Sequence, residues 1–250
     1  MNMFKDKVAI ITGGGAGIGL ATAQLLAAKG VKVLITGRRK GALEEAAASN
    51  PNIRGFEADA SDPEAAALTV KAALELWGRL DILVNNAGGG VIQPLADINA
   101  KSIFDIFAVN VAGPTLLAAA AIPHLEETKG TIINMSSTYG SKAAAGLSLY
   151  AASKAAVEHL TRCWALELAP KGIRVNAIAS GPVETAFLRD RMGLSEEQIT
   201  AVKEQEREAI PLGRRGEPDD VARWIVNLAD SEASWITGQI IAVDGGLVIS

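Results

Sequence analysis

Tyr150 and Lys154 are the two residues whose types and spacing point most directly to chemistry. A helix turns once per 3.6 residues, so residues four apart share a face and the ammonium can lie near the tyrosine oxygen. Lowering a tyrosine pKa from ~10 to about 7 needs roughly 4 kcal/mol, which one charge at about 4 Å supplies at an effective dielectric of about 20. The pair could therefore pass a proton near neutral pH, although this spacing also occurs in ordinary helices.

Seven short apolar runs alternate with longer helical patterns along the chain. Strands that are apolar throughout are typical of a parallel sheet with helices on both faces, so we predict a doubly wound, Rossmann-like α/β fold with seven parallel strands. The expected strands are 8–12, 31–36, 53–57, 81–85, 131–136, 173–178 and 239–243. The expected helices are near 17–29, 40–48, 63–76, 101–125, 150–169 and 217–229.

The polar stretch from Pro182 to Pro218 breaks this alternation. It follows the end of a strand, holds a helical pattern near 195–208 and contains no strand pattern. An insertion at that place suits a lid over a binding site. We therefore expect one domain spanning 1–250 with a substrate lid at about 183–217.

Composition and charge narrow the class of protein. The net charge is −4 and the 24 basic residues are scattered, so nucleic acid is a poor partner. Cys163 is the only cysteine, which leaves no internal disulfide, and it falls within an apolar helical stretch that does not suit a catalytic thiol. Met1–Lys7 lacks the apolar core of a signal peptide, and the apolar stretch 111–123 is too short to cross a bilayer. We expect a cytoplasmic protein with no membrane partner.

A glycine-rich turn joins the first strand to the first helix, with glycines at 13, 14, 15, 17 and 19. Glycines allow a tight bend and a close backbone approach to a pyrophosphate, which the amides at a helix start attract. The spacing is Gly-x-x-x-Gly-x-Gly rather than the commoner Gly-x-Gly-x-x-Gly. This turn predicts a dinucleotide site that includes Gly13, Gly15, Gly17, Ile18 and Gly19.

The end of the second strand indicates which dinucleotide binds. Many such folds carry an acid there that binds the ribose 2′-hydroxyl of NAD, but this chain has Gly37 followed by Arg38 and Arg39. Guanidinium groups match a phosphate geometrically, so this end favours NADP. NAD remains an alternative, since two arginines can also simply solvate a loop.

Together these residues resemble the short-chain dehydrogenase/reductase superfamily, in its short single-domain branch that includes 3-oxoacyl-carrier-protein reductases. The resemblance covers essentially the whole chain. Its motifs are the glycine turn, Asn85-Asn86-Ala87-Gly88, Asn110, Ser137, Tyr150 with Lys154, and Gly181-Pro182-Val183-Glu184-Thr185. It implies hydride transfer between a nicotinamide and a carbonyl or secondary alcohol, with no metal.

The resemblance assigns the catalytic roles. It implies that Tyr150 is the acid in reduction and the base in oxidation, while Lys154 lowers its pKa and holds the nicotinamide ribose. Ser137 would steady the substrate oxygen, and the spacing to the tyrosine favours it over Ser136. Asn110 would anchor a water in a proton relay, or it could simply bend its helix.

The resemblance also assigns the cofactor contacts. Asp59 would bind the adenine amino group, and Asn86, Ala87 and Gly88 would line the adenine ribose side, although Asn86 could be purely structural. The segment that starts at Pro182 would bind the carboxamide and pyrophosphate through the Val183 backbone and the Thr185 hydroxyl. Ile18 and Thr12 would support them.

The substrate is left open. Ala143, Ala144, Leu147, Phe187 and Leu188 would give a largely apolar pocket, in which Lys142 and Arg189 are better explained as solvated charges. A 3-oxoacyl-carrier-protein reductase would place basic residues such as Lys129 and Lys171 at the pocket mouth. A sugar or secondary alcohol dehydrogenase is the alternative, and a catalytically silent dinucleotide sensor is the non-enzyme alternative. The family tail at 234–246, with helices 101–125 and 150–169, predicts a homotetramer.

Overall fold

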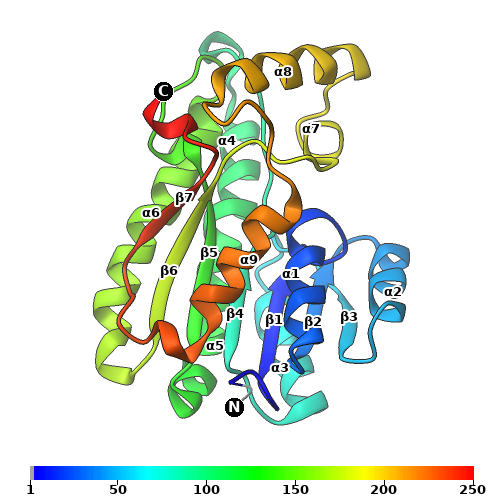
Figure 1. The fold of residues 1–250 in the computed structure, drawn as a ribbon, viewed down its shortest axis with the longest axis vertical. Coiled ribbons are helices and arrows are strands. Elements are labelled where there is room, and N and C mark those ends of the chain that lie inside the picture. The colour runs from blue at the N-terminus through cyan, green and yellow to red at the C-terminus, as the bar shows by residue number, and fades with distance from the viewer. Residues whose placement is uncertain (1–2) are drawn as a thin grey trace.

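A single parallel sheet organises the computed structural model, which describes residues 3–250 (Figure 1). Its seven strands run in the order β3-β2-β1-β4-β5-β6-β7, and every pairing is parallel. The strands are β1 (Val8–Thr12), β2 (Lys32–Gly37), β3 (Ile53–Glu57), β4 (Ile82–Asn85), β5 (Thr131–Ser137), β6 (Arg174–Ser180) and β7 (Ile240–Val243). The predicted doubly wound α/β fold is confirmed. The strand order reverses between β1 and β4, where such sheets bind ligands at their carboxyl ends.

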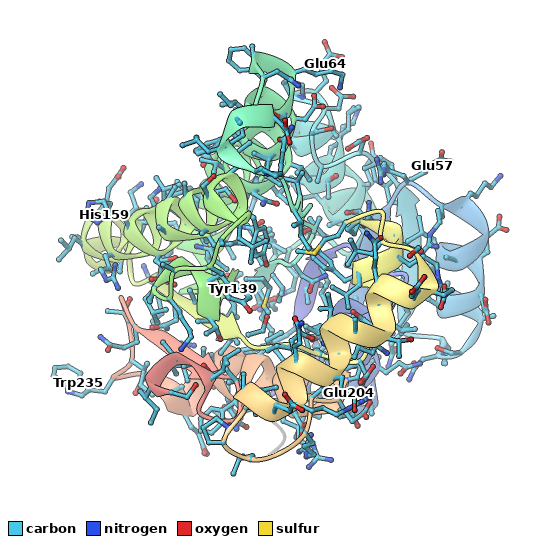
Figure 2. The ribbon with its side chains drawn as sticks, turned by 90° about the horizontal axis from the view of Figure 1, so that it is seen from above. Glu57, Glu64, Tyr139, His159, Glu204 and Trp235 are labelled. Carbon is cyan, nitrogen blue, oxygen red and sulfur yellow. The ribbon has the colours of Figure 1, made fainter. Side chains whose placement is uncertain are left out.

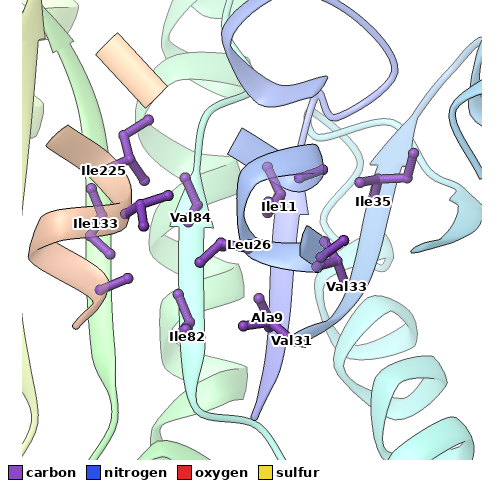
Figure 3. Packing of buried hydrophobic residues seen from close by; sticks show 14 of the residues in the cluster. Ala9, Ile11, Leu26, Val31, Val33, Ile35, Ile82, Val84, Ile133 and Ile225 are labelled. Carbon is purple, nitrogen blue, oxygen red and sulfur yellow. The ribbon is translucent and has the colours of Figure 1, made fainter. Parts of the chain in front are cut away.

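Helices cover both faces of the sheet. On one face lie α1 (Gly17–Ala28), α2 (Lys40–Ala48) and α9 (Pro218–Ala229), and on the other α3 (Ala65–Trp77), α5 (Gly113–Thr128) and α6 (Ser148–Leu168). Alternate residues of each strand serve alternate layers: Ala9 and Ile11 pack on the α1 side with Leu26, while Val8 and Ile10 pack on the other. Figure 3 shows the first of these layers. Burial on both faces explains why the central strands β1 and β4 are almost entirely apolar, whereas edge strand β3 carries exposed polar residues.

The single helix predicted at 101–125 is wrong. The structure has α4 (Ala100–Phe107), a π-helical turn (Ala108–Ala112) and α5 in its place. Pro114 has no backbone N–H to donate, and the side chain of Asn110 is bonded to the backbone of Gly89 in both directions, at 2.8 and 3.0 Å. Gly113 lies so close to another loop that a Cβ there would be 1.9 Å from the carbonyl oxygen of Ala60. These contacts lie at the π-helical turn Ala108–Ala112, which is wider than an α-helical turn and separates α4 from α5.

The helical run Ala100–Thr128 is long and apolar enough to cross a membrane by length and composition. It is longer than the apolar stretch 111–123 expected from the sequence. Four of its apolar side chains, Leu117, Ala118, Ala121 and Leu125, are buried against the sheet. Packing in the layer that holds α3 and α6 accounts for the apolar character of that side of the run.

The insertion after β6 lies above the carboxyl ends of the strands (Figure 1). Its two ends meet, because Val183 and Gly216 form an isolated parallel bridge and Glu184 N–H donates to Gly216 O at 2.8 Å. It carries α7 (Phe187–Asp190) and α8 (Glu196–Ala209). Ser195 and Gln198 form a capping box that begins α8, which confirms the helix predicted here. Five short 3₁₀ turns complete the described chain: Leu95–Asp97, Thr138–Gly140, Ala169–Lys171, Ser231–Ala233 and Leu247–Ile249.

Candidate active site

A cleft of about 450 Å³ opens at the carboxyl ends of the strands, beneath α7 and α8. It brings together most of the residues expected to act in catalysis or cofactor binding. The predicted residues that line it are Gly13, Gly15, Gly17, Ile18, Arg38, Arg39, Asn86, Ala87, Gly88, Ser137, Tyr150, Lys154, Pro182, Val183 and Thr185. Segments from the first and second halves of the chain thus share one site.

Tyr150 and Lys154 lie on the buried face of α6, one turn apart. The Lys154 Nζ is 5.8 Å from the centre of the Tyr150 ring and donates a hydrogen bond of 2.9 Å to the Met135 carbonyl oxygen. The ring of Phe187, from α7, packs 6.3 Å from that of Tyr150. The predicted pair is therefore fixed at the cleft floor between the sheet and the insertion.

The pKa values of the pair differ from the sequence prediction. Burial raises the pKa of Tyr150, a hydrogen bond with Ser137 opposes that rise, and nearby Tyr139 adds to it. Lys154 does not contribute to this balance, and its own burial lowers its pKa to about 8. The expectation that Lys154 alone brings the tyrosine near neutrality is wrong for these protein groups, because desolvation outweighs the distant charge. The phenol is held protonated, which suits a proton donor.

Ser137 is the serine that faces the tyrosine. It ends β5 and lines the cleft with Tyr150, whose pKa it lowers, and its hydroxyl accepts a 3.3 Å hydrogen bond from the Tyr139 N–H. The neighbouring Ser136 points away and donates to the buried carboxylate of Glu158 at 2.9 Å. Alternation along the strand separates the two hydroxyls, which agrees with the choice of Ser137.

Asn110 lies behind the cleft wall and does not line the cleft itself. Its amide donates to Gly89 O at 3.0 Å and to the Ser153 hydroxyl at 2.9 Å, and its oxygen accepts from Gly89 N–H. It borders a small hollow that it shares with Lys154. This position is compatible with both interpretations of Asn110 from the sequence. Asn110 sits in the π-helical turn, as a helix-bending residue would, and it lies beside Lys154, as a residue of a proton relay would.

The glycine turn leaves the start of α1 open toward the cleft. Gly13 and Gly17 have positive φ values of 66° and 54°, which favour glycine. The helix begins without a side-chain cap or an acid in its first turn, so its amides are available to an anion. A Cβ at Gly17 would lie 3.0 Å from the methyl of Thr185, so the turn and the segment after β6 approach closely.

Two predicted cofactor residues lie outside the cleft. Gly19 faces inward, where a Cβ would be 2.5 Å from Gly13 O, so it serves packing and not contact. Asp59 lines an adjoining hollow with Thr12 and Ala87. Burial pushes the Asp59 pKa up, but hydrogen bonds from Ser61 and the charge of Arg38 bring it below its usual value. Asp59 is thus an ionised acid beside the cleft rather than within it.

Asn86 has a structural role in addition to its place in the cleft. Its side chain donates to Thr12 O at 2.8 Å and to Gly13 O at 3.3 Å, which ties the end of β4 to the glycine turn. The Thr12 hydroxyl accepts from the backbone N–H groups of Asn86 and Ala87 at 3.0 and 2.9 Å. Thr12 therefore holds the start of the segment after β4 in place.

Several residues of the cleft were missed or misplaced by the sequence analysis. Tyr139, Arg191, Glu206 and Arg215 line it and were not predicted. Figure 2 shows Tyr139 near the middle of this end of the molecule, beside α8. Tyr139 could have been found, because it lies two residues beyond Ser137. The lid residues carry no local signal, because their place depends on the path of the insertion.

Arg215 is the most buried of these, with 5% of its surface exposed. It donates to Val183 O at 2.7 Å and pairs with Glu184 at 3.1 Å and with Glu206. Its place in the cleft was not expected from the sequence.

Other expectations about the pocket were wrong. Lys129 and Lys171 lie at the opposite end of the sheet, just before β5 and β6, and Lys171 pairs with Glu126 at 2.8 Å. The interpretation of Lys142 and Arg189 as solvated charges agrees with the structure, since both lie outside the cleft, where Lys142 bonds to the Ser250 carbonyl oxygen and Arg189 pairs with Glu196 at 2.6 Å. The cleft wall is formed by Phe187 and Leu188, as expected, but not by the residues predicted at 143, 144 and 147. Cys163 is exposed and lies outside the cleft.

Comparison with known proteins agrees with this geometry. A family model described as enoyl-(acyl carrier protein) reductase matches residues 13–248. The chain belongs to the short-chain dehydrogenase/reductase superfamily. It is 40% identical to an uncharacterized oxidoreductase of Mycobacterium tuberculosis, over 99% of this chain and 95% of that protein. It is 36% identical to a 3-oxoacyl-[acyl-carrier-protein] reductase of Thermotoga maritima, over 98% and 99% of the two chains.

A solved structure extends the likeness to three dimensions. A short-chain dehydrogenase/reductase of unknown function from Caenorhabditis elegans, determined with its cofactor, superimposes with a TM-score of 0.92 at 32% identity, over 99% of this chain and 97% of that one. The chain is therefore an NAD(P)-dependent oxidoreductase that acts on carbonyl or alcohol groups. The open glycine turn, the uncapped start of α1 and the adjoining cleft fit a nicotinamide dinucleotide.

Proposed function

We propose that this oxidoreductase reduces a ketone with NADPH and that Tyr150 donates the proton. The observation that carries the proposal is that Tyr150, Ser137 and Lys154 line one cleft together with the glycine turn and two arginines after β2. The raised pKa of the phenol keeps it protonated at neutral pH, as a donor requires.

The protein groups would divide the work as follows. A bound nicotinamide supplies the hydride. Ser137 and Tyr150 would both hold the carbonyl oxygen, and the Tyr150 hydroxyl would give it a proton as the carbonyl carbon is reduced. Lys154, still largely protonated at pH 7 with a pKa of about 8, would stabilise the phenolate left behind. Asn110 would hold the backbone at Gly89 and the Ser153 hydroxyl that flank this proton path.

The remaining cleft residues would hold the cofactor. The backbone from Gly15 to Ile18 lines the cleft at the start of α1, where its amides would meet a pyrophosphate, with Thr185 opposite. The Val183 N–H would serve the carboxamide, since its carbonyl oxygen already accepts from Arg215. Ala87 and Gly88 line the wall between them.

The proposed preference for NADPH rests on Gly37, Arg38 and Arg39. No acid stands at the end of β2 itself, and both arginines are exposed and line the cleft, where Arg38 lies 3.9 Å from Asp59 and Arg39 lies 3.1 Å from Asp190. Kinetics with NADPH and NADH test this. We expect a lower KM for NADPH in the wild type and a reduced preference in Arg38→Ala. Equal use of both cofactors by the wild type would overturn the preference.

The lining of the cleft also suggests which kind of ketone is the substrate. Phe187, Leu188 and Met192 form an apolar wall, and Tyr139, Glu206 and Arg215 form a polar one, so a ketone with an apolar body and a polar substituent fits best. A 3-oxoacyl thioester carried by an acidic protein is less favoured, because Lys129 and Lys171 lie far from the cleft. A panel of hydroxyketones, keto acids, simple ketones and 3-oxoacyl thioesters would rank these classes. Fastest turnover of the thioesters would refute this ranking.

The same panel of carbonyl compounds distinguishes an enzyme from a catalytically silent dinucleotide sensor. A sensor would bind NADPH and turn over none of the carbonyls, whereas the proposed enzyme oxidises NADPH only when a ketone is present. The hydrogen-bonded Ser137 and Tyr150 favour the enzyme.

The proposal includes a cytoplasmic homotetramer. Large apolar side chains stand exposed on the surfaces predicted to meet partner copies: Phe104 on α4, Leu116 on α5 and Leu166 on α6. Trp235 is 98% exposed and projects from the edge of the molecule near β7 (Figure 2). Burial of such a set against other copies would be favourable. Sedimentation at micromolar concentration should give a tetramer, and a monomer would refute it.

A further inference from the structure

The short helix α7 of the lid reaches both ends of the cleft. At its beginning, the Phe187 ring packs 6.3 Å from the ring of catalytic Tyr150. At its end, the Asp190 carboxylate accepts a 3.1 Å hydrogen bond from Arg39, in the loop between β2 and α2. One rigid turn of helix therefore spans from the proton donor to the residues after β2.

Packing against the loop after β4 fixes α7 in this position. A Cβ at Gly90 would lie 2.8 Å from the Met192 methyl and 2.9 Å from the edge of the Phe187 ring. The lid can approach this closely because residue 90 is a glycine. Because Phe187 and Met192 both pack against Gly90, a displacement at one end of α7 should also displace the other end.

Three guanidinium groups line the cleft near the end of α7: Arg38, Arg39 and Arg191. Arg38 lies 3.9 Å from Asp59 and Arg39 lies 3.1 Å from Asp190. Among residues 3–250, Arg191 has no carboxylate within ion-pair distance. Burial lowers the pKa of Arg191, repulsion from Arg38 and Arg39 lowers it further, and the more distant charges of Asp190 and Asp59 only partly oppose this.

This end of the cleft thus holds more positive than negative charge. Two carboxylates, Asp59 and Asp190, stand against the three arginines. A phosphate monoester carries close to two negative charges at neutral pH and offers three acceptor oxygens, so it would relieve the repulsion.

We propose that Arg191 is a specificity-determining residue that binds the 2′-phosphate of NADP(H) from the lid, and that this contact fixes α7 and places Phe187 beside the substrate. The inference rests on the proposed use of NADPH and extends it. Arg38 and Arg39 would contact the phosphate from the loop after β2, whereas Arg191 would contact it from the insertion after β6. The phosphate thereby affects substrate affinity as well as cofactor affinity.

The first test measures binding without turnover. Calorimetry with 2′,5′-ADP and with 5′-ADP compares the wild type with Arg191→Ala, and with Arg189→Ala as a matched control on the same helix that pairs with Glu196. We expect Arg191→Ala to weaken 2′,5′-ADP about tenfold, as loss of a charged hydrogen bond does, and to leave 5′-ADP and the control unchanged. Unchanged 2′,5′-ADP binding in Arg191→Ala, with a loss in Arg38→Ala, would overturn this inference alone. A wild type that binds both ligands equally would overturn the NADPH preference as well.

The second test distinguishes the effect of Arg191, in the insertion after β6, from that of Arg38, in the loop after β2. At saturating NADPH, Arg191→Ala should raise the KM for the ketone several-fold, whereas Arg38→Ala should leave that KM near the wild-type value. A ketone KM that is unchanged in Arg191→Ala, or raised equally by both substitutions, would contradict the coupling through α7.

Discussion

Replacement of Lys154 by methionine should stabilise the protein while it abolishes turnover. The lysine is buried beside the cleft, and its burial lowers the pKa from 10.5 to about 8. Below pH 8 the folded protein holds a charge that would be better solvated in the unfolded chain. Methionine has a similar length and carries no charge to desolvate.

The size of the effect follows from the pKa difference. At 1.36 kcal/mol per unit, a drop from 10.5 to about 8 costs the folded state about 3 kcal/mol at pH 7. The substitution also loses the hydrogen bond to Met135 O, worth about 1 kcal/mol. The net gain in unfolding free energy should be about 2 kcal/mol.

The stability advantage of Lys154→Met should depend on pH. Between pH 8 and 10.5 the unfolded chain binds more protons at residue 154 than the folded protein does, so the wild type gains stability as pH rises. The penalty falls to about 2 kcal/mol at pH 9 and about 1 kcal/mol at pH 10. The advantage of Lys154→Met should therefore shrink across this range.

Chemical denaturation of both proteins at pH 7, 8 and 9 measures this. Lys40→Met is the control, because Lys40 is exposed and only pairs with Glu44 at 3.9 Å. We expect no pH-dependent gain there. A Lys154→Met protein that is less stable than wild type at pH 7, or whose advantage grows with pH, would refute the account of Lys154 as a buried charge retained for catalysis.

Two further predictions follow from the same structure. Gly113→Ala should lower the unfolding free energy by several kcal/mol in denaturation, because its Cβ would lie 1.9 Å from Ala60 O, whereas Gly41→Ala meets nothing within 4 Å and should be neutral or stabilising by about 0.5 to 1 kcal/mol. Equal effects would contradict the packing. The rate of ketone reduction at saturating substrates should fall above about pH 8, to about a tenth of its plateau by pH 9, as Lys154 loses its proton and Tyr150 keeps its own. A rate that stays flat to pH 10 would exclude this role for the lysine charge.

Much of the fold could be predicted because its signals are local. The predicted strands 8–12 and 53–57 match β1 and β3 residue for residue, and the apolar run of β1 ends where the glycines begin. The helix expected at 101–125 failed because its break depends on bonds between Asn110 and Gly89, which are 21 positions apart. No window of sequence reports such a contact.

The site divides in the same way. Tyr150 and Lys154 were found because helical spacing is local, and Ser137 was found through the family resemblance and its spacing to the tyrosine. Arg191 and Arg215 were not, because the conformation of the lid brings them to the cleft. The error at Lys129 and Lys171 was avoidable, since both precede strands and ligands bind where parallel strands end.

The pKa of Tyr150 shows a limit of a different kind. The charge of Lys154 could be read from the sequence, but not its distance or the burial of both groups. Desolvation depends on every element that covers the pair, including Phe187 from the lid. The direction of the Tyr150 pKa shift therefore required the structure.

The central claim is that the Tyr150 hydroxyl supplies the proton in ketone reduction. The most direct measurement is ketone-dependent NADPH oxidation by the wild type and Tyr150→Phe, with NADPH binding measured on both proteins. We predict that the substitution keeps NADPH affinity within about twofold and lowers kcat by about a hundredfold or more, in line with the loss of a general acid. A Tyr150→Phe protein that binds NADPH and reduces the ketone at the wild-type rate would contradict the account.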